Sequence, residues 1–138
     1  MLSKKTKYGI KALVYLAGKG AHNPVLISEI AKSENISKKF LEAILLQLKK
    51  NGFLGSKMGK GGGYYLLKEP EHMTIASVYR VLEGPIAMLP CVSLNYYEKC
   101  DDCNSEEECI LHKMMIQVRD RTLEVYENKT ISDLLNKK

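Results

Sequence analysis

The four cysteines of the chain all lie in one short stretch, CVSLNYYEKCDDCNSEEECILH, which covers residues 91–112. They are Cys91, Cys100, Cys103 and Cys109, and His112 ends the stretch. Thiolates and imidazole nitrogens are the ligands of zinc, and thiolates with an occasional histidine hold iron–sulfur clusters. Because the rest of the chain has no cysteine, the stretch is predicted to serve one chemical purpose.

Three chemistries compete for these residues. Zinc would take four of the five ligands, although zinc sites usually show two close cysteine pairs and this stretch has one Cys-x2-Cys. A redox switch needs two thiols, one with a lowered pKa, and the acidic residues between positions 101 and 108 act against that. An iron–sulfur cluster needs several thiolates on one loop. The spacing favours the cluster and leaves zinc, redox thiols and inert cysteines open.

The rest of the composition predicts a cytoplasmic protein of one domain's length. The chain has 138 residues, and no segment approaches the run of about 18 apolar residues that crosses a bilayer. Lys11 and Lys19 interrupt the apolar residues near the N-terminus, where a signal peptide would lie. In the reducing cytoplasm, clustered cysteines bind metal or sense redox state more often than they form disulfides.

Charge divides the chain into two unlike halves. Residues 1–68 carry 13 lysines and three glutamates, a net charge of +10, whereas residues 69–138 carry 8 basic and 13 acidic residues, a net charge of −5. Such asymmetry indicates that the front half binds a polyanion. A lysine-rich solvated surface is the plainer alternative.

The front half has the pattern of a helix–turn–helix followed by a β-hairpin. Apolar residues Ile27, Ile30 and Ala31 mark one helix, which Ser28 or the preceding loop can cap, and residues 33–35 break it. Ser37 is a suitable N-cap for a second helix that stops near Asn51-Gly52. Residues 53–67 then predict a hairpin with a glycine-rich tip, and the whole is the winged-helix arrangement.

In that arrangement the second helix enters the major groove and the wing lies along the backbone or in the minor groove of double-stranded DNA. Lysines there neutralise phosphates, a glutamate can accept a hydrogen bond from cytosine, and glycines allow close approach. The predicted DNA-binding residues are Ser28, Ser37, Lys38, Lys39, Phe40, Glu42, Lys57, Lys60, Gly61, Gly62 and Gly63. Phe40 is expected to pack more than to contact a base.

The back half predicts a helix capped near Thr74 and ended by Gly84-Pro85, the cysteine loop, and a long helix from about residue 106 to 128. In the long helix an apolar stripe of two heptads suits a homodimer interface; it comprises Leu111, Met115, Val118, Thr122 and Val125. The fold class is therefore mainly α with a β-hairpin wing. We expect a DNA-binding domain at 1–84, a sensor loop at 85–109, and a dimerisation helix with a C-terminal segment at 110–138.

Three segments, KYGIKALVYLA, ISKKFLEAILLQLKKNGFL and GKGGGYYL, resemble the IscR/NsrR-type (Rrf) winged-helix transcription regulators, and VYRVLEGPI and TISDLL are similar as well. The resemblance covers nearly the whole chain. It implies a homodimeric regulator, in most members a repressor, that binds pseudo-palindromic operators and is not an enzyme. Many members hold an iron–sulfur cluster that sets DNA affinity in response to iron–sulfur status, redox state or nitric oxide.

The resemblance also implies cluster ligands. Cys91, Cys103 and Cys109 match the family's three cysteines, and the fourth ligand is His112 or Cys100. The familiar gap between the first two cysteines is five residues, but it is eleven here, which departs from the pattern. A 2Fe-2S cluster is expected ahead of a 4Fe-4S cluster. The alternatives are a zinc-bound or cofactor-free regulator that answers a small molecule or partner protein, and a small iron–sulfur carrier protein.

Overall fold

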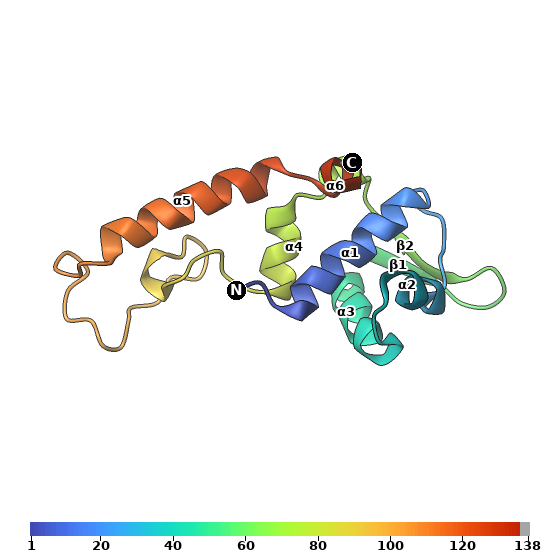
Figure 1. Cartoon of the computed structure of the whole chain (residues 1–138), viewed down its shortest axis with the longest axis horizontal. Helices are drawn as coiled ribbons and strands as arrows, with labels where there is room; N and C mark the ends of the chain where they lie inside the picture. Colours follow the sequence, from blue (N-terminus) through green and yellow to red (C-terminus); the bar gives the residue numbers. More distant parts are fainter. Residues whose placement is uncertain (136–138) are drawn as a thin grey trace.

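The computed structural model describes residues 1–135, and it is mainly helical with one antiparallel hairpin, as the sequence predicts (Figure 1). The expected third segment, 110–138, ends in residues 136–138, which lie outside the described part. The elements, in chain order, are α1 (Lys4–Gly18), α2 (Ile27–Glu34), α3 (Lys38–Lys50), β1 (Leu54–Lys57), β2 (Gly63–Leu66), the 3-10 turn η1 (Pro70–His72), α4 (Ile75–Leu82), the 3-10 turn η2 (Pro90–Val92), α5 (His112–Asn128) and α6 (Ile131–Leu135).

The turn between α2 and α3 follows from two polar residues. Asn35 ends α2 in the left-handed conformation, with φ 55°, which asparagine tolerates better than most residues. The Ser37 side chain then accepts a hydrogen bond from the Phe40 backbone N–H at 3.3 Å and so caps α3. The predicted helix–turn–helix is confirmed at both residues.

The apolar face of α3 forms the centre of the core. Its four core-facing side chains are fully buried and belong to one cluster with Leu13 and Leu16 of α1; these four are Leu41, Ile44, Leu45 and Leu48. Each such side chain contributes roughly 1.5–3 kcal/mol to folding relative to full exposure. Because this face is buried, the opposite face of α3, which carries the lysines and Glu42, points outward.

The hairpin is tied to the helix–turn–helix by a backbone bridge. β1 and β2 pair antiparallel, with Leu54 opposite Leu66. Val25, which precedes α2, exchanges two backbone hydrogen bonds of 2.8 and 2.9 Å with Tyr64 of β2. A side chain at Gly63 would collide with the Val25 carbonyl, so only glycine permits this approach. The wing therefore has a fixed position beside the start of α2.

α4 begins and ends where the sequence predicts. The Thr74 hydroxyl accepts a hydrogen bond from the Ser77 N–H at 3.2 Å, and Gly84 follows the helix with φ 109°. The predicted start of the long helix near residue 106 is wrong, because α5 begins at His112. Residues 106–112 form two successive turns instead, each closed by an N–H that donates to the carbonyl three residues earlier. The residue before the helix, Leu111, supplies no side-chain cap.

α5 leaves the domain and α6 returns to it. The backbone joins η1 and α4 to the start of α6 through Ile75 N–H to Lys129 O at 2.8 Å and Ile131 N–H to Met73 O at 2.9 Å. Ile131 is completely buried in the same core cluster as α1 and α3. The cysteine loop and the tip of the wing end up at opposite ends of the molecule (Figure 1).

Because α6 completes the core, Ile131→Ala should lower the free energy of unfolding by about 2–5 kcal/mol, as large-to-small changes at buried positions do. Leu134→Ala, at a side chain that is 36% exposed, is the matched control and should cost much less. Urea denaturation followed by circular dichroism measures both. Equal losses for the two variants would contradict a structural role for α6 in the domain.

Candidate functional site

The beginning of α3 is exposed and basic. Ser37, Lys38, Lys39 and Glu42 are all exposed, on the side of the helix opposite the buried leucines. Phe40 is 38% exposed, and its ring meets the Tyr8 ring edge-on at 5.8 Å. This geometry agrees with a packing role for Phe40 and leaves the polar residues free to contact DNA.

Ser28 is exposed in the first turn of α2, but it does not cap that helix, because the N-cap position is Leu26 in the preceding loop. α2 is held instead by Glu29, whose carboxylate accepts a hydrogen bond from the Tyr15 hydroxyl at 2.6 Å and pairs with Lys19 at 3.3 Å. The hydrogen bond from Tyr15, followed by that from Lys19, lowers the pKa of Glu29. The ion pair fixes α2 against the end of α1.

The wing carries two exposed lysines, Lys57 and Lys60. Gly61, beside Lys60, is exposed with positive φ and open space around it, which suits close approach to a phosphate. Gly62 is buried against the hairpin's own carbonyls, and Gly63 lies against Val25. The hairpin itself explains these last two glycines, and a phosphate contact at them stays a prediction.

The start of α1 is also basic, which the sequence prediction of the DNA-binding residues did not include. The Tyr8–Phe40 contact places the first turns of α1 beside the beginning of α3. Lys4 and Lys7 lie in those turns and are exposed, so they extend the positive face of α3. The lysine-rich opening KKTK was a visible signal.

Cys91 joins the two ends of the cysteine loop. It is 7% exposed in η2, and its Sγ lies 3.6 Å from Nδ1 of His112, the first residue of α5. Burial, together with the neighbouring Cys100 thiol, raises the pKa of Cys91 to about 11, and Glu106 adds to the shift. Such a thiol is protonated at neutral pH and a poor nucleophile.

The remaining thiols are partly buried farther along the loop. Burial raises the pKa of Cys103, and the neighbouring Cys109 and Cys100 thiols raise it further. Tight turns shape this region, with the Cys103 N–H donating to the Cys100 carbonyl at 3.2 Å. The Tyr97 hydroxyl donates a hydrogen bond to the Glu106 carboxylate and so links the two arms of the loop.

The donor types suit a metal centre, but the loop does not arrange them as one. All four thiols are free, and Cys91 has both proposed fourth ligands, His112 and Cys100, as neighbours. Within residues 1–135, no three cysteine, histidine or acidic side chains converge closely enough to hold a metal ion. A metal centre held by Cys103 and Cys109 together with Cys91 would therefore require the loop to close around it.

Arg119, which the sequence pattern did not single out, anchors this region to α5. Its guanidinium donates a hydrogen bond to the Val92 carbonyl at 2.9 Å and contacts Asp120 at 2.8 Å. Arg119 follows His112 by seven residues, so both lie on one face of α5. That face contacts η2 at two successive residues, Cys91 and Val92.

Comparisons with known proteins agree with this architecture. The model of the Rrf2 family, described as iron-dependent transcriptional regulators, matches residues 2–137, and the chain belongs to this family. An rrf2-like HTH-type transcriptional regulator of Rhodobacter capsulatus is 40% identical over 138 residues, which cover 98% of this chain and 92% of the relative.

Two solved structures are similar over nearly the whole chain. The structure of CymR, the global cysteine regulator of Bacillus subtilis, has a TM-score of 0.79 and 31% identity, and the match covers 98% of this chain and 95% of that one. IscR from T. potens has a TM-score of 0.76 and 29% identity, with 98% and 85% covered. The fold is thus that of Rrf2-family winged-helix regulators, and the family implies DNA binding.

These relatives are named for transcriptional regulation or cysteine regulation, and none of the names denotes an enzyme. In the described part of the chain, no helix combines the length and the apolar composition that a bilayer span demands.

The burial of Cys91 leads to a test on protein without bound metal. At neutral pH, Cys91 should react with iodoacetamide at least about tenfold more slowly than Cys100, because its thiol is shielded and protonated. Mass spectrometry of timed digests measures each cysteine separately. Unfolding in urea is the control and should equalise the rates. A Cys91 that reacts as fast as Cys100 in the folded protein would contradict the packing of η2.

Proposed function

We propose that the chain is a cytoplasmic, homodimeric DNA-binding repressor and not an enzyme. α3 enters the major groove of a pseudo-palindromic operator, and the wing contacts the backbone or the minor groove. The observation that carries this proposal is the exposed basic beginning of α3, fixed in place by its buried leucine face. Lys57 and Lys60 of the wing add positive charge to the same half of the chain.

The two faces of α5 support a dimer. One face contacts the cysteine loop and α4 through Arg119, Leu123 and Tyr126, and the Tyr126 ring lies 5.1 Å from that of Tyr79. Part of the predicted apolar stripe lies elsewhere: Leu111 and Val125 are 44% and 55% exposed, and Val118 lines a surface groove with Met114 as well as the side toward α4. An apolar face of a long helix that its own domain leaves uncovered suits a second copy of the chain.

DNA binding through α3 predicts a strong dependence on salt. The logarithm of the association constant falls linearly as the logarithm of the salt concentration rises. Replacing Lys38 and Lys39 by alanine should make this negative slope shallower, by about 0.9 for each phosphate that is no longer neutralised. Fluorescence anisotropy over a salt series, on a duplex selected from a random library by the wild-type protein, measures the slope.

Lys113→Ala is the matched control, because Lys113 is an exposed lysine on α5, far along the chain from α3. It should leave the slope nearly unchanged. An equal decrease for the control would show that overall charge, and no specific surface, governs binding.

We further propose that an iron–sulfur cluster, a 2Fe-2S cluster ahead of a 4Fe-4S cluster, sets operator affinity. Cys91, Cys103 and Cys109 would hold it, with His112 or Cys100 as the fourth ligand. The contact between Cys91 and His112 supports this, because it already brings ligands from both ends of the loop together. The family description as iron-dependent regulators points the same way.

When bound, such a cluster reacts with oxidants and nitric oxide or dissociates when iron is scarce. The protein's own residues determine how the loop responds. Arg119 keeps the segment that bears Cys91 against α5, and burial keeps the Cys91 thiol away from solvent. Cys103 and Cys109 occupy the turns that must move for the loop to close.

A second candidate is a regulator that holds zinc or no cofactor and answers a small molecule or a partner protein. Two observations favour it: the described thiols do not converge, and a structurally similar relative is a global cysteine regulator. In that case the Cys91–His112 contact would serve to keep the loop folded on α5.

Anaerobic purification separates the candidates. The first predicts a coloured protein with about two irons and two sulfides per chain. Cys91→Ala, Cys103→Ala and Cys109→Ala should each lose the colour and the iron, and comparison of His112→Ala with Cys100→Ala identifies the fourth ligand.

Ser105→Ala, in the same loop, is the control and should keep the full iron content. A colourless protein after anaerobic reconstitution would reject the cluster, and stoichiometric zinc would support the second candidate.

A further inference from the structure

The last turn of α4 is bonded to both helices that form the DNA-reading half. Gln47 of α3 donates its side-chain N–H to the Val81 carbonyl at 2.8 Å. Glu83 accepts the backbone N–H of Ser3, at the start of α1, at 2.8 Å. Between them, Leu82 fills the space beside Gly9, where any side chain would collide with it.

These contacts fix the turn firmly. The Ser3 N–H lowers the pKa of Glu83, so this carboxylate is charged at neutral pH and its hydrogen bond is charge-assisted. Gly84 comes next with φ 109°, and the chain turns into the segment that leads to Cys91. The last turn of α4 is therefore connected to Cys91 by the short segment 85–90.

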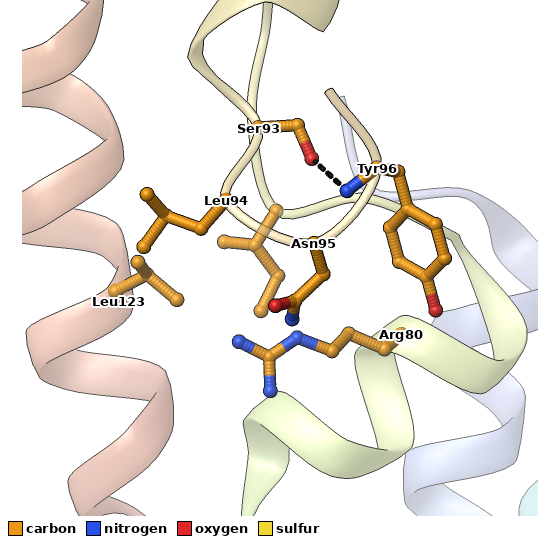
Figure 2. A pocket seen from close by; sticks show the side chains of 7 residues that line it. Arg80, Ser93, Leu94, Asn95, Tyr96 and Leu123 are labelled. Carbon is orange, nitrogen blue, oxygen red and sulfur yellow. Dashed lines mark hydrogen bonds between the residues drawn. The ribbon is translucent and has the colours of Figure 1, made fainter. Parts of the chain in front are cut away.

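The cysteine loop also lies beside α4, across a small cavity. Residues 93–96 fold over α4 and enclose a small cavity with Arg80, Ile86 and Leu123. Figure 2 shows Arg80, next in sequence to Val81, reaching toward Asn95 beneath this segment. The same segment is held at its start by the Arg119 hydrogen bond to Val92. Ile86, at the start of this region, packs with Ala76 of α4 and Leu123 of α5. The loop, α5 and α4 are thus neighbours, and the Gln47 hydrogen bond joins α4 to α3.

We propose that Gln47 is a positioning residue of the recognition helix. Its bond to Val81 passes the state of the loop segment 92–96 to α3 and so to operator affinity. Gln47 is suited to this role because α3 packs on α4 through apolar side chains, which allow small sliding movements. Among the described residues, its directed hydrogen bond to Val81 is the one that joins the two helices, and it fixes the register of α3 against α4. The inference rests on the proposed DNA-binding function, and it does not require the iron–sulfur cluster.

A double-mutant cycle tests the proposal on the full chain. Arg119→Gln removes the guanidinium that holds the Val92 carbonyl to α5, and Gln47→Met removes the donor to Val81 while keeping the side chain's length. Anisotropy measures the dissociation constant of each protein for the duplex selected by the wild type. Size-exclusion chromatography must show the same oligomeric state for all variants.

Arg119→Gln is expected to change the dissociation constant by about fivefold or more in the wild-type background, the lower end of typical coupling between sites. With Gln47→Met already present, the same change should alter the dissociation constant by less than about twofold, because the link between α4 and α3 is already lost. Independent sites would instead give the same factor in both backgrounds, to within about twofold. Leu46→Met, at the neighbouring exposed position of α3, is the control background and should preserve the full response.

Equal factors in the wild-type and Gln47→Met backgrounds would overturn the proposal, and so would an Arg119→Gln variant that binds DNA as the wild type does. Hydrogen exchange of the α3 amides adds a readout without DNA: Arg119→Gln should raise it only when Gln47 is present. If no variant binds the duplex but the exchange response persists, the proposed DNA-binding function fails while the coupling stands.

Discussion

The burial of one face of α3 constrains everything else in this molecule. Leu41, Ile44, Leu45 and Leu48 are fully enclosed, so the helix cannot rotate about its axis without exposing apolar surface. That restriction decides which side chains face outward at its start, where the lysines lie. It also places Gln47 at the edge of the core, where a polar side chain can reach the α4 backbone. The surface proposed to read DNA is a consequence of the packing behind it.

The same core draws in parts of the chain that are distant in sequence, whereas the cysteine loop differs from it in kind. Ile131 of α6 packs among the residues of α1 and α3, so the far end of α5 is anchored in the winged-helix core. The loop at the other end has turns in place of regular secondary structure, and its firm contacts are few. A segment with few stabilising contacts can change its conformation at low free-energy cost. A well-packed winged-helix core and a loop with few contacts are what a regulator with a responsive loop would need.

The sequence by itself determined the elements of local origin. Ser37, Thr74 and Gly84 specify helix boundaries through caps and backbone conformation, and the leucine spacing specifies the buried face of α3. It also revealed the thiol cluster and the separation of charge. Such features depend on residues within a few positions of one another, so they are visible in a linear pattern.

Only the tertiary structure decided the contacts between distant segments. Nothing in the pattern around Glu106 shows that the chain forms turns there and starts α5 at His112. The bonds of Arg119 to Val92 and of Gln47 to Val81 join residues 27 and 34 positions apart. No sequence periodicity indicates the partner of a single polar side chain of this kind, because the partner is a backbone carbonyl, which every residue possesses. Their roles depend on which elements the burial of the core brings together.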